Sequence, residues 1–274
     1  MSTWHIQEIA AELYTARSNA EVIPEKLSDR YPKMTLDDAY TIQADLVKLY
    51  QEKGYTPTGY KIGFASKALI RKFGLSTVGW ANVYDQTVHY FADSSSTFSL
   101  AGTIAPKIEP EIVFKLKEPL TTGSQDAAAV LAASEWYALG FEIVDCVFPN
   151  WGFKPVDFVA TVGFHIALLV GEPQKIEAAN IPALVEQLET FKLKLSKNGK
   201  VVAEGAGKNV YGNPALCLGE LAEAMARQAG SPTLVAGDVI TSGTISDPQL
   251  ILPGEEWVAE VSGLDLPILS AKFS

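Results

Sequence analysis

The chain has 274 residues, of which 47% are hydrophobic and 20% charged, so it can bury a large core, and one large domain with an appendage is favoured over two equal domains. The formal net charge is −10, and the lysines and arginines do not cluster in one segment. This excludes a nucleic-acid backbone and an anionic membrane surface as the expected partners. A small anionic substrate stays open if a metal ion or a few local lysines receive it.

The two cysteines, Cys146 and Cys217, lack the spacing of metal ligands, and the first ten residues have no basic region followed by an apolar one. The longest apolar run, around residues 166–170, is too short to span a bilayer. We therefore expect a reduced, cytoplasmic protein that is not inserted in a membrane.

Two helices are predicted in the first part of the chain. Residues 4–20 carry apolar side chains at helical spacing. In the second helix, Thr35 can cap the first turn with Asp38 three residues later, and Gly54 ends the apolar stripe. The sequence therefore predicts an N-terminal helical arm over residues 1–57.

Strands dominate from residue 58 onward. The segments with strand patterns are 59–64, 87–91, 107–117, 138–146, 158–171, 191–205, 237–243, 256–263 and 266–273. Asn198 and Gly199 predict a tight hairpin, and residues 213–229 predict a capped helix. Because helices interrupt the strands rather than alternate with them, a doubly wound sheet or a TIM barrel is disfavoured. We expect an α+β fold in which residues 58–274 form a large, rolled, mixed β-sheet.

The stretch KIEPEIVFKLK, residues 107–117, combines an apolar face with a pair of carboxylates. At the two-residue period of a strand, Glu109 and Glu111 lie on one face. Pro110 lies between them and indicates a sheet edge or a bulge, because proline cannot donate to a ladder. Two carboxylates this close ionise easily only beside a cation or in water. The stretch is therefore either a site for a hard divalent cation or the solvated outer face of an edge strand.

A third carboxylate, Glu142, lies among apolar residues that place it inside a strand. A buried glutamate costs several kcal/mol unless something pairs with it. Together with the first two carboxylates, Glu142 would complete an oxygen-only site for Mg²⁺ or Mn²⁺. The alternative is a buried salt bridge with Lys154 or Lys61.

Lys61, in GYKIGF, shares a predicted strand with bulky neighbours. It is either a general acid or base, or a group that holds a substrate carboxylate, or an ordinary surface lysine. His165, in VGFHIALL, is interpreted as a core histidine whose hydrogen bonds are satisfied. The chain has no HExxH, CxxC, GxSxG or P-loop motif.

An ordered set of segments resembles the hydratase and decarboxylase branch of the fumarylacetoacetate hydrolase superfamily, over nearly the whole chain. The segments are YPKMTLDDAYTIQ, GYKIGFASKA, PKIEPEIVFKL, FEIVDCVFPNW, KNGKVVAEGAG, GNPALCLGELA and AGDVITSGT. The resemblance implies a Mg²⁺ or Mn²⁺ ion held by Glu109, Glu111 and Glu142, and it implies that Lys61 faces the metal-bound substrate as the catalytic residue. The implied enzyme is a lyase that acts on a 2-oxo acid through a metal-stabilised dienolate, in the breakdown of aromatic compounds.

Two departures from the family pattern bear on the reaction. Thr77 stands where the hydratases tend to carry an acidic residue, which weakens the case for hydration. VATVGF, residues 159–164, replaces a polar segment, and with Trp151 and Phe164 it makes the inferred substrate pocket more apolar.

Three further residues are expected at the substrate. Lys67 or Lys154 would bind a distal carboxylate, if the substrate has one. Ser242 lies in the matching segment AGDVITSGT and is expected to contact the substrate as well.

The resemblance favours hydration of a 2-hydroxy-2,4-dienoate with a neutral tail. Decarboxylation of a 2-oxo-3-enedioate is the close alternative, and a non-catalytic protein that binds a 2-oxo acid or partners another lyase is a remoter one. Hydrolysis of a C–C bond is disfavoured, because no histidine and carboxylate pair for activating water is recognisable in the sequence. The resemblance also implies a homo-oligomer and leaves an association with a related lyase open.

Overall fold

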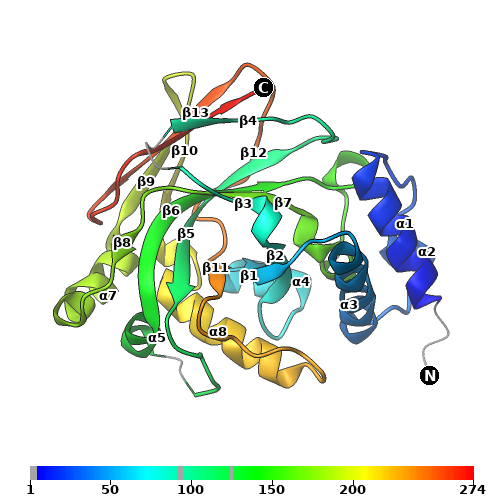
Figure 1. Cartoon of the computed structure of the whole chain (residues 1–274), viewed down its shortest axis with the longest axis horizontal. Coiled ribbons are helices and arrows are strands. Elements are labelled where there is room, and N and C mark those ends of the chain that lie inside the picture. The colour runs from blue at the N-terminus through cyan, green and yellow to red at the C-terminus, as the bar shows by residue number, and fades with distance from the viewer. Residues whose placement is uncertain (1–4, 92–94, 124–125) are drawn as a thin grey trace.

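The computed structural model describes residues 5–91, 95–123 and 126–274. A large curved sheet lies at its centre, and a smaller sheet packs above it (Figure 1). The larger sheet has the order β2-β1-β11-β5-β6-β7-β3, with β12 beside β5 and β8 beside β6. Its strands are β1 (Pro57–Gly63), β2 (Gly79–Tyr84), β3 (Val88–Tyr90), β5 (Lys107–Leu116), β6 (Ser134–Val144), β7 (His165–Val170), β8 (Gln174–Lys175), β11 (Val239–Thr241) and β12 (Gln249–Leu250). Because β1 and β11 are parallel while β5 and β6 are antiparallel, the sheet is mixed, which confirms the predicted α+β class.

The smaller sheet has the order β10-β9-β13-β14-β4. Its strands are β4 (Ser95–Phe98), β9 (Lys192–Lys197), β10 (Lys200–Ala206), β13 (Glu256–Ser262) and β14 (Leu269–Phe273). The predicted hairpin joins β9 to β10, and both Asn198 (φ 49°) and Gly199 (φ 77°) have the positive φ that such a turn requires.

The predicted N-terminal helices are confirmed, as the helices drawn in blue beside the sheet in Figure 1. They are α1 (Ile6–Ser18), the short α2 (Leu27–Arg30) and α3 (Leu36–Glu52). The Thr35 and Asp38 side chains form the expected capping box at the start of α3. Trp4, at the start of the first predicted helix, lies outside the described residues.

The remaining helices lie between strands. They are α4 (Lys67–Phe73), α5 (Ala127–Ala133), α6 (Pro155–Ala160), α7 (Ile181–Thr190) and α8 (Pro214–Arg227), together with short 3₁₀ segments at Asp85–Thr87, Pro149–Trp151, Val162–Phe164, Ala178–Asn180 and Gly207–Asn209. The Asn213 side chain accepts a hydrogen bond from the Ala215 N–H and caps α8, as the sequence predicted. Among the described residues, no helix is both long and apolar enough to cross a membrane.

The prediction of one strand over residues 158–171 is wrong for its first half. Residues 155–160 form α6, a 3₁₀ turn follows, and only residues 165–170 form a strand. Pro155 begins the helix, and the Asp157 carboxylate accepts a hydrogen bond from the Lys154 N–H at 2.8 Å. This local capping outweighs the strand preference of the apolar residues that follow.

The prediction that Pro110 marks a sheet edge is also wrong, and so is the alternative of a solvated outer face. β5 is an interior strand, and the Glu111 side chain is fully buried. Pro110 is tolerated because its missing N–H would point at the loop between β11 and β12 rather than at β6. On that side the Pro110 carbonyl accepts a hydrogen bond from the Ile245 N–H. The proline therefore removes no hydrogen bond from the ladder with β6.

An ion pair fastens the N-terminal arm to the sheet next to the glutamate strand. The buried Asp145, just after β6, accepts hydrogen bonds from the Ile104 N–H (2.7 Å) and the Ala105 N–H (2.8 Å) in the segment that leads into β5. The Arg17 guanidinium of α1 lies 3.3 Å from the same carboxylate and also bonds the Gly102 carbonyl. This carboxylate thus joins α1, β6 and the entry to β5.

Replacing Asp145 by alanine is expected to lower the free energy of unfolding by about 3 kcal/mol, because two backbone N–H groups and a guanidinium lose their acceptor. Urea unfolding followed by circular dichroism measures the change. Asp45→Ala is the control, because Asp45 pairs with an exposed lysine within α3 and should matter little. An unchanged unfolding midpoint for Asp145→Ala would show that the arm is held in another way.

Candidate active site

Three carboxylates meet on two neighbouring interior strands. Glu109 of β5 lies directly opposite Glu142 of β6, and Glu111 follows two residues later on the same face. One oxygen from each of the three lies within 4.8 Å of the others. The cluster that the sequence suggested is therefore assembled by strand register alone.

Lys61 reaches this cluster from β1. Its register partner is Thr241 of β11, and Thr241 pairs in turn with β5, so Lys61 lies on the same face as the glutamates. The Lys61 Nζ lies 3.0 Å from Glu142 Oε2 and donates to the Gly163 carbonyl at 3.0 Å. The two predictions for Glu142, a metal ligand and a member of a buried salt bridge, are thus compatible. Glu142 belongs to the carboxylate cluster and also forms a buried ion pair with Lys61.

The backbone beside Lys61 adopts an unusual conformation. Val162, Gly163 and Phe164 have φ values of 52°, 62° and 60°, and this left-handed run presents the Gly163 carbonyl to the ammonium. A Cβ atom on Gly163 would lie 2.6 Å from Lys61 Cδ. Glycine is therefore needed at 163 for the space that the lysine occupies, and it also adopts the positive φ without strain.

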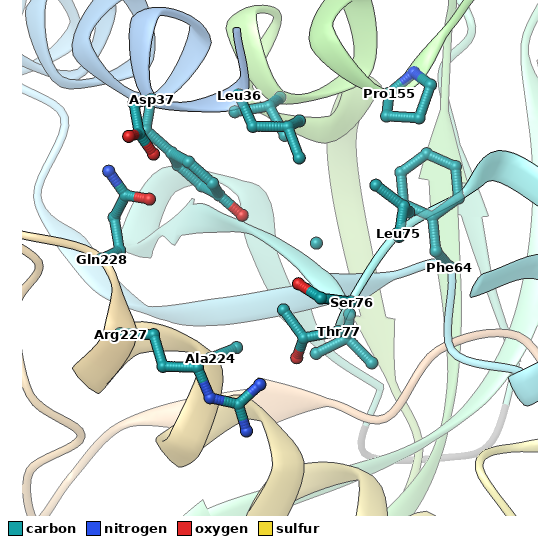
Figure 2. Close-up of a pocket in the computed structure, with 14 residues that line it drawn as sticks. Leu36, Asp37, Phe64, Leu75, Ser76, Thr77, Pro155, Ala224, Arg227 and Gln228 are labelled. Atoms are coloured by element: carbon teal, nitrogen blue, oxygen red, sulfur yellow. The ribbon is translucent and has the colours of Figure 1, made fainter. Parts of the chain in front are cut away.

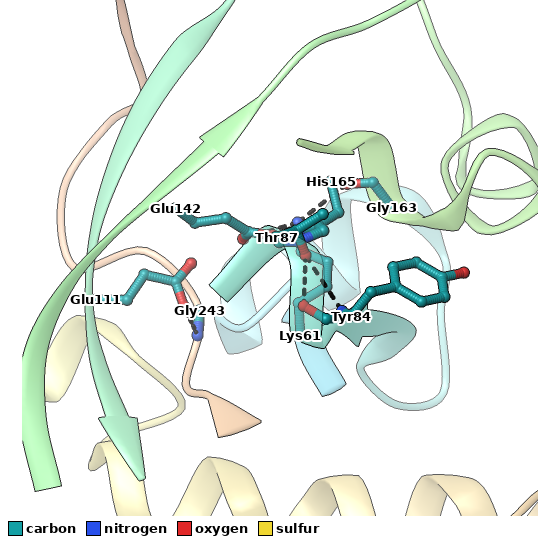
Figure 3. A network of polar contacts seen from close by, with 8 residues as sticks. All are labelled: Lys61, Tyr84, Thr87, Glu111, Glu142, Gly163, His165 and Gly243. Atoms are coloured by element: carbon teal, nitrogen blue, oxygen red, sulfur yellow. Dashed lines mark hydrogen bonds and ion pairs between the residues drawn. The ribbon is translucent and has the colours of Figure 1, made fainter. Parts of the chain in front are cut away.

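His165, interpreted from sequence as a satisfied core residue, is a partner of the cluster (Figure 3). Its Nδ1 lies 2.9 Å from Glu142 Oε1, and its Nε2 lies 2.8 Å from Thr87 Oγ1. The expectation that the chain has no histidine and carboxylate pair is therefore wrong. The pair is nonetheless buried with both ring nitrogens engaged, which leaves no ring nitrogen to activate a water. Thr87 carried no signal in the sequence, and pairing of His165 with β6 depended on the turn after α6.

Charge and burial act against each other in this cluster. Burial raises the pKa of Glu109 to about 7, although Lys61 opposes the shift. Burial, reinforced by Glu142 and Glu109, raises the pKa of Glu111 well above its usual value. Burial would also raise the pKa of Glu142, but Lys61 and His165 outweigh it and lower that pKa. Burial would lower the pKa of Lys61, yet the three carboxylates hold it above the ordinary lysine value.

The cluster has the donors and the charge that a divalent cation needs. Glu111 Oε2 accepts a hydrogen bond from the Gly243 N–H at 2.7 Å, whereas among the described residues no donor reaches the buried Glu111 Oε1. With all groups ionised, three carboxylates and one ammonium leave an excess of two negative charges. The free oxygen and the excess charge both fit Mg²⁺ or Mn²⁺, which prefer oxygen ligands.

Two aromatic residues expected at the substrate lie in a ring cluster next to Lys61. The Phe158 ring centroid lies 5.1 Å from Lys61 Nζ, and the buried Phe164 packs against Phe158 with ring centroids 5.7 Å apart. Trp151 packs against Phe164, while its Nε1 donates to the Ala105 carbonyl. These rings wall off one side of Lys61 from water.

The other expected substrate residues are dispersed. Ser242 is fully buried, and its hydroxyl lies between the Ile112 N–H and the Gly243 carbonyl, each at 3.3 Å. Lys67, at the start of α4, is exposed, and its ammonium lies 5.1 Å from the Tyr211 ring centroid. Lys154 is exposed and lies 3.7 Å from Asp29 in the N-terminal arm, so Lys61 rather than Lys154 is the partner of Glu142.

A cavity of about 230 Å³ lies beside this site, between α3 and α6 on one side and α8 on the other (Figure 2). Phe64 lines it, and the Phe64 ring lies 4.9 Å from Phe158, which covers Lys61. The wall of the cavity is therefore in contact with Lys61 through Phe64 and Phe158. Thr77 and Arg227 contribute polar groups to the wall, and most other lining side chains are apolar.

Comparison with known proteins relates this chain to lyases. Residues 60–270 match the family model described as fumarylacetoacetate (FAA) hydrolase C-terminal. The chain is 30% identical to a 2-hydroxyhexa-2,4-dienoate hydratase of Comamonas testosteroni, with 94% of each protein covered. It is also 30% identical to a 4-oxalocrotonate decarboxylase of Pseudomonas sp. strain CF600, with 93% and 92% covered.

A solved structure gives the same relationship. The 4-oxalocrotonate decarboxylase from Pseudomonas putida G7, complexed with magnesium and adipate, superposes with a TM-score of 0.88 at 26% identity. The match covers 100% of this chain and 99% of the other. Hydratases and decarboxylases are thus both among the similar proteins.

Replacing Glu111 by glutamine is expected to lower the affinity for Mn²⁺ by at least roughly 100-fold, because the variant loses one anionic oxygen ligand inside a buried site. Isothermal titration with Mn²⁺ measures the change. Glu256→Gln, on the exposed face of β13, is the matched control and should bind Mn²⁺ like the parent protein. Equal affinities for the two variants would remove Glu111 from the ligand set.

Mn²⁺ affinity is also expected to fall as the pH is lowered, by about tenfold for each pH unit well below the Glu109 pKa of about 7, because a proton then competes with the ion. The free energy of unfolding of the metal-free protein should instead fall as the pH rises, because burial raises the Glu109 pKa. The contribution of Glu109 to this free energy is fully present below the ordinary glutamate pKa and is lost as the pH rises through about 7. Titrations and thermal unfolding over this pH range test both signs, and Glu109→Gln should flatten both profiles.

Proposed function

The chain belongs to the fumarylacetoacetate hydrolase family, and we propose that it is a divalent-metal-dependent lyase that hydrates a 2-hydroxy-2,4-dienoate with a neutral tail. The observation that carries this proposal is the convergence of Glu109, Glu111 and Glu142 beside the ammonium of Lys61. A protein that only binds another lyase has no need of three converging carboxylates, because the burial of Glu111 and Glu142 costs stability. The relatives named above support a lyase that breaks down products of aromatic ring cleavage.

The chain's own residues account for binding and for proton movement. Glu109, Glu111 and Glu142 would hold Mg²⁺ or Mn²⁺, which when bound would stabilise negative charge on the carboxylate and 2-oxygen of the substrate. Lys61, fixed by Glu142 and Gly163, would donate a proton to the substrate or remove one. Phe158 and Phe164 would exclude bulk water from the lysine, which strengthens each electrostatic interaction there.

A neutral tail is supported by what surrounds the cluster. Lys154 pairs with Asp29 in the N-terminal arm, away from the carboxylates. Lys67, exposed beside Tyr211, is left as the candidate for a distal carboxylate, and Ser242 uses its hydroxyl on the backbone. The cavity beside Phe64 is mainly apolar.

Decarboxylation of a 2-oxo-3-enedioate is the second candidate. It is favoured by the likeness to a decarboxylase structure that contains adipate, a dicarboxylate. In that case Lys67 would bind the distal carboxylate. We also propose a homo-oligomer from the family resemblance, with an association to a related lyase as an extension of it.

A product assay with Mg²⁺ distinguishes the two reactions. We expect 2-hydroxypenta-2,4-dienoate to be consumed without release of CO₂, and 2-oxohex-3-enedioate to be left intact, because Lys61 is paired with Glu142, Lys154 lies beside Asp29 and Lys67 is exposed beside Tyr211. Ultraviolet absorbance and CO₂ release measure the two outcomes. CO₂ from the second compound would make the protein a decarboxylase, and Lys67→Met should then raise KM for the dioate.

A further inference from the structure

A carboxylate from a distant part of the chain lies beside Thr77. The Thr77 hydroxyl donates a hydrogen bond to Glu220 Oε1 at 2.5 Å. Glu220 lies on α8, and its side chain is only 10% exposed. A carboxylate is therefore present at the position where the sequence, on its own, lacks one.

This pair lies at the same edge of the sheet as the carboxylate cluster. Gly63 ends β1, and its register partner Gly79 begins the antiparallel β2, so Thr77 lies just beyond that edge. β11 runs parallel to β1 and continues to Gly243 at the same edge, where the Gly243 N–H binds Glu111. The strand directions therefore bring Thr77 and Glu111 to one end of the sheet.

A chain of close contacts joins Glu220 to the cluster. The Tyr211 phenol lies near Glu220: burial first, and then this carboxylate, raise the pKa of Tyr211 to about 12. The Tyr211 N–H donates to the Ala65 carbonyl at 2.7 Å. A Cβ on Gly243 would lie 2.1 Å from the Ala65 Cβ, so Ala65 and Gly243 are in tight contact. Tyr211, Ala65 and Gly243 thus form a continuous path of contacts from Glu220 to Glu111.

A buried thiol on α8 is close enough to both carboxylates to feel their charges. Cys217 lies one turn before Glu220 on α8 and is fully buried. Burial raises its pKa most, and the charges of Glu111 and Glu220 raise it further. Both carboxylates therefore lie near the same side chain of α8.

The pair has the geometry of a proton relay. Because Thr77 gives its hydrogen to Glu220, the lone pairs of Thr77 Oγ1 remain available to a water or a substrate hydroxyl in the adjoining cavity, which Thr77 lines (Figure 2). Arg227 lies 3.6 Å from the same Glu220 oxygen and supplies a counter-charge. The other end of the relay, Glu220, is shielded from bulk solvent.

We propose that Glu220, acting through Thr77, is the positioning and proton-accepting residue of the addition step, an inference that rests on the proposed hydration. The water oxygen bonds to the far carbon of the double bond, and the electron pair of that bond moves to the carbon nearer the 2-oxo group. The proton that the water loses passes to Thr77 Oγ1 as the Thr77 proton passes to Glu220. The nearer carbon then takes a proton from Lys61, the role proposed for that residue. Glu220 returns its proton through Thr77 to water in the cavity and Lys61 regains a proton from water, so that one molecule of water adds in net.

Two variants test the relay with Mg²⁺-loaded protein. Glu220→Gln keeps an acceptor for Thr77, so a purely structural tether survives, whereas a relay does not. We expect kcat to fall by roughly 100-fold or more in Glu220→Gln and in Thr77→Val, since general acid and base groups contribute about that much. KM and Mn²⁺ affinity should stay within about twofold of the parent values, because neither residue is a metal ligand.

The control is Glu223→Gln, the other glutamate of α8, whose carboxylate caps the Gly123 N–H and which should leave kcat unchanged. The double variant Thr77→Asp with Glu220→Gln restores a carboxylate at position 77 and should regain at least about tenfold in kcat over Glu220→Gln. Full activity of Glu220→Gln overturns the relay. A loss of activity accompanied by a loss of Mn²⁺ affinity overturns it as well, because the residue would then serve the fold of the site.

Mn²⁺ binding and product assays on the parent protein distinguish a failure of this inference from a failure of the proposed function. If the parent protein binds Mn²⁺ but releases CO₂ from 2-oxohex-3-enedioate, hydration is overturned and the relay falls with it, because decarboxylation adds no water. If the parent protein hydrates 2-hydroxypenta-2,4-dienoate and Glu220→Gln does so at the same rate, the relay alone is overturned, whereas a loss of roughly 100-fold in kcat supports it. If the parent protein transforms neither compound, both proposals are overturned together.

Discussion

The convergence of three carboxylates, two of them fully buried, beside one buried ammonium is the constraint on which the rest of this structure depends. Isolated charges at this depth would be prohibitively costly, so each needs a fixed partner. Glu142 has Lys61 and His165, and Glu111 has the Gly243 N–H and one free oxygen. The left-handed turn at Gly163 orients Lys61, and the interior position of β5 keeps the glutamates away from bulk solvent. The unfavourable charge that remains is what a divalent cation would neutralise.

The N-terminal arm contributes to this site without supplying a charged residue to it. α1 and α3 share an apolar cluster with Phe158 and Phe164, the rings that exclude water from Lys61. Asp145 connects the helical arm to the segment before β5, because its carboxylate accepts hydrogen bonds from the backbone N–H groups of Ile104 and Ala105. Because a strand cannot shift by one residue without turning its side chains to the other face, the register of β5 against β6 depends on such anchors.

The same sheet edge presents two kinds of chemistry from different elements. Glu109, Glu111 and Glu142 come from adjacent strands, whereas Thr77 and Glu220 come from a loop and a helix that are distant in the sequence. An acidic function near position 77 therefore need not be encoded at position 77. Departures from a family motif are for this reason poor grounds, on their own, for assigning one reaction over another.

The sequence by itself determined the α+β class, the capped helices at Thr35 and Asn213, the hairpin at Asn198 and the three glutamates that converge. These depend on periodicity, capping and turn chemistry, which act over a few residues. Only the tertiary structure decided that residues 158–164 leave the sheet, that Pro110 lies in an interior strand, and that His165 pairs with Glu142. It also decided that Glu220 reaches Thr77. Each of these depends on which strands and helices become neighbours, and contacts between distant segments leave no local pattern in one sequence.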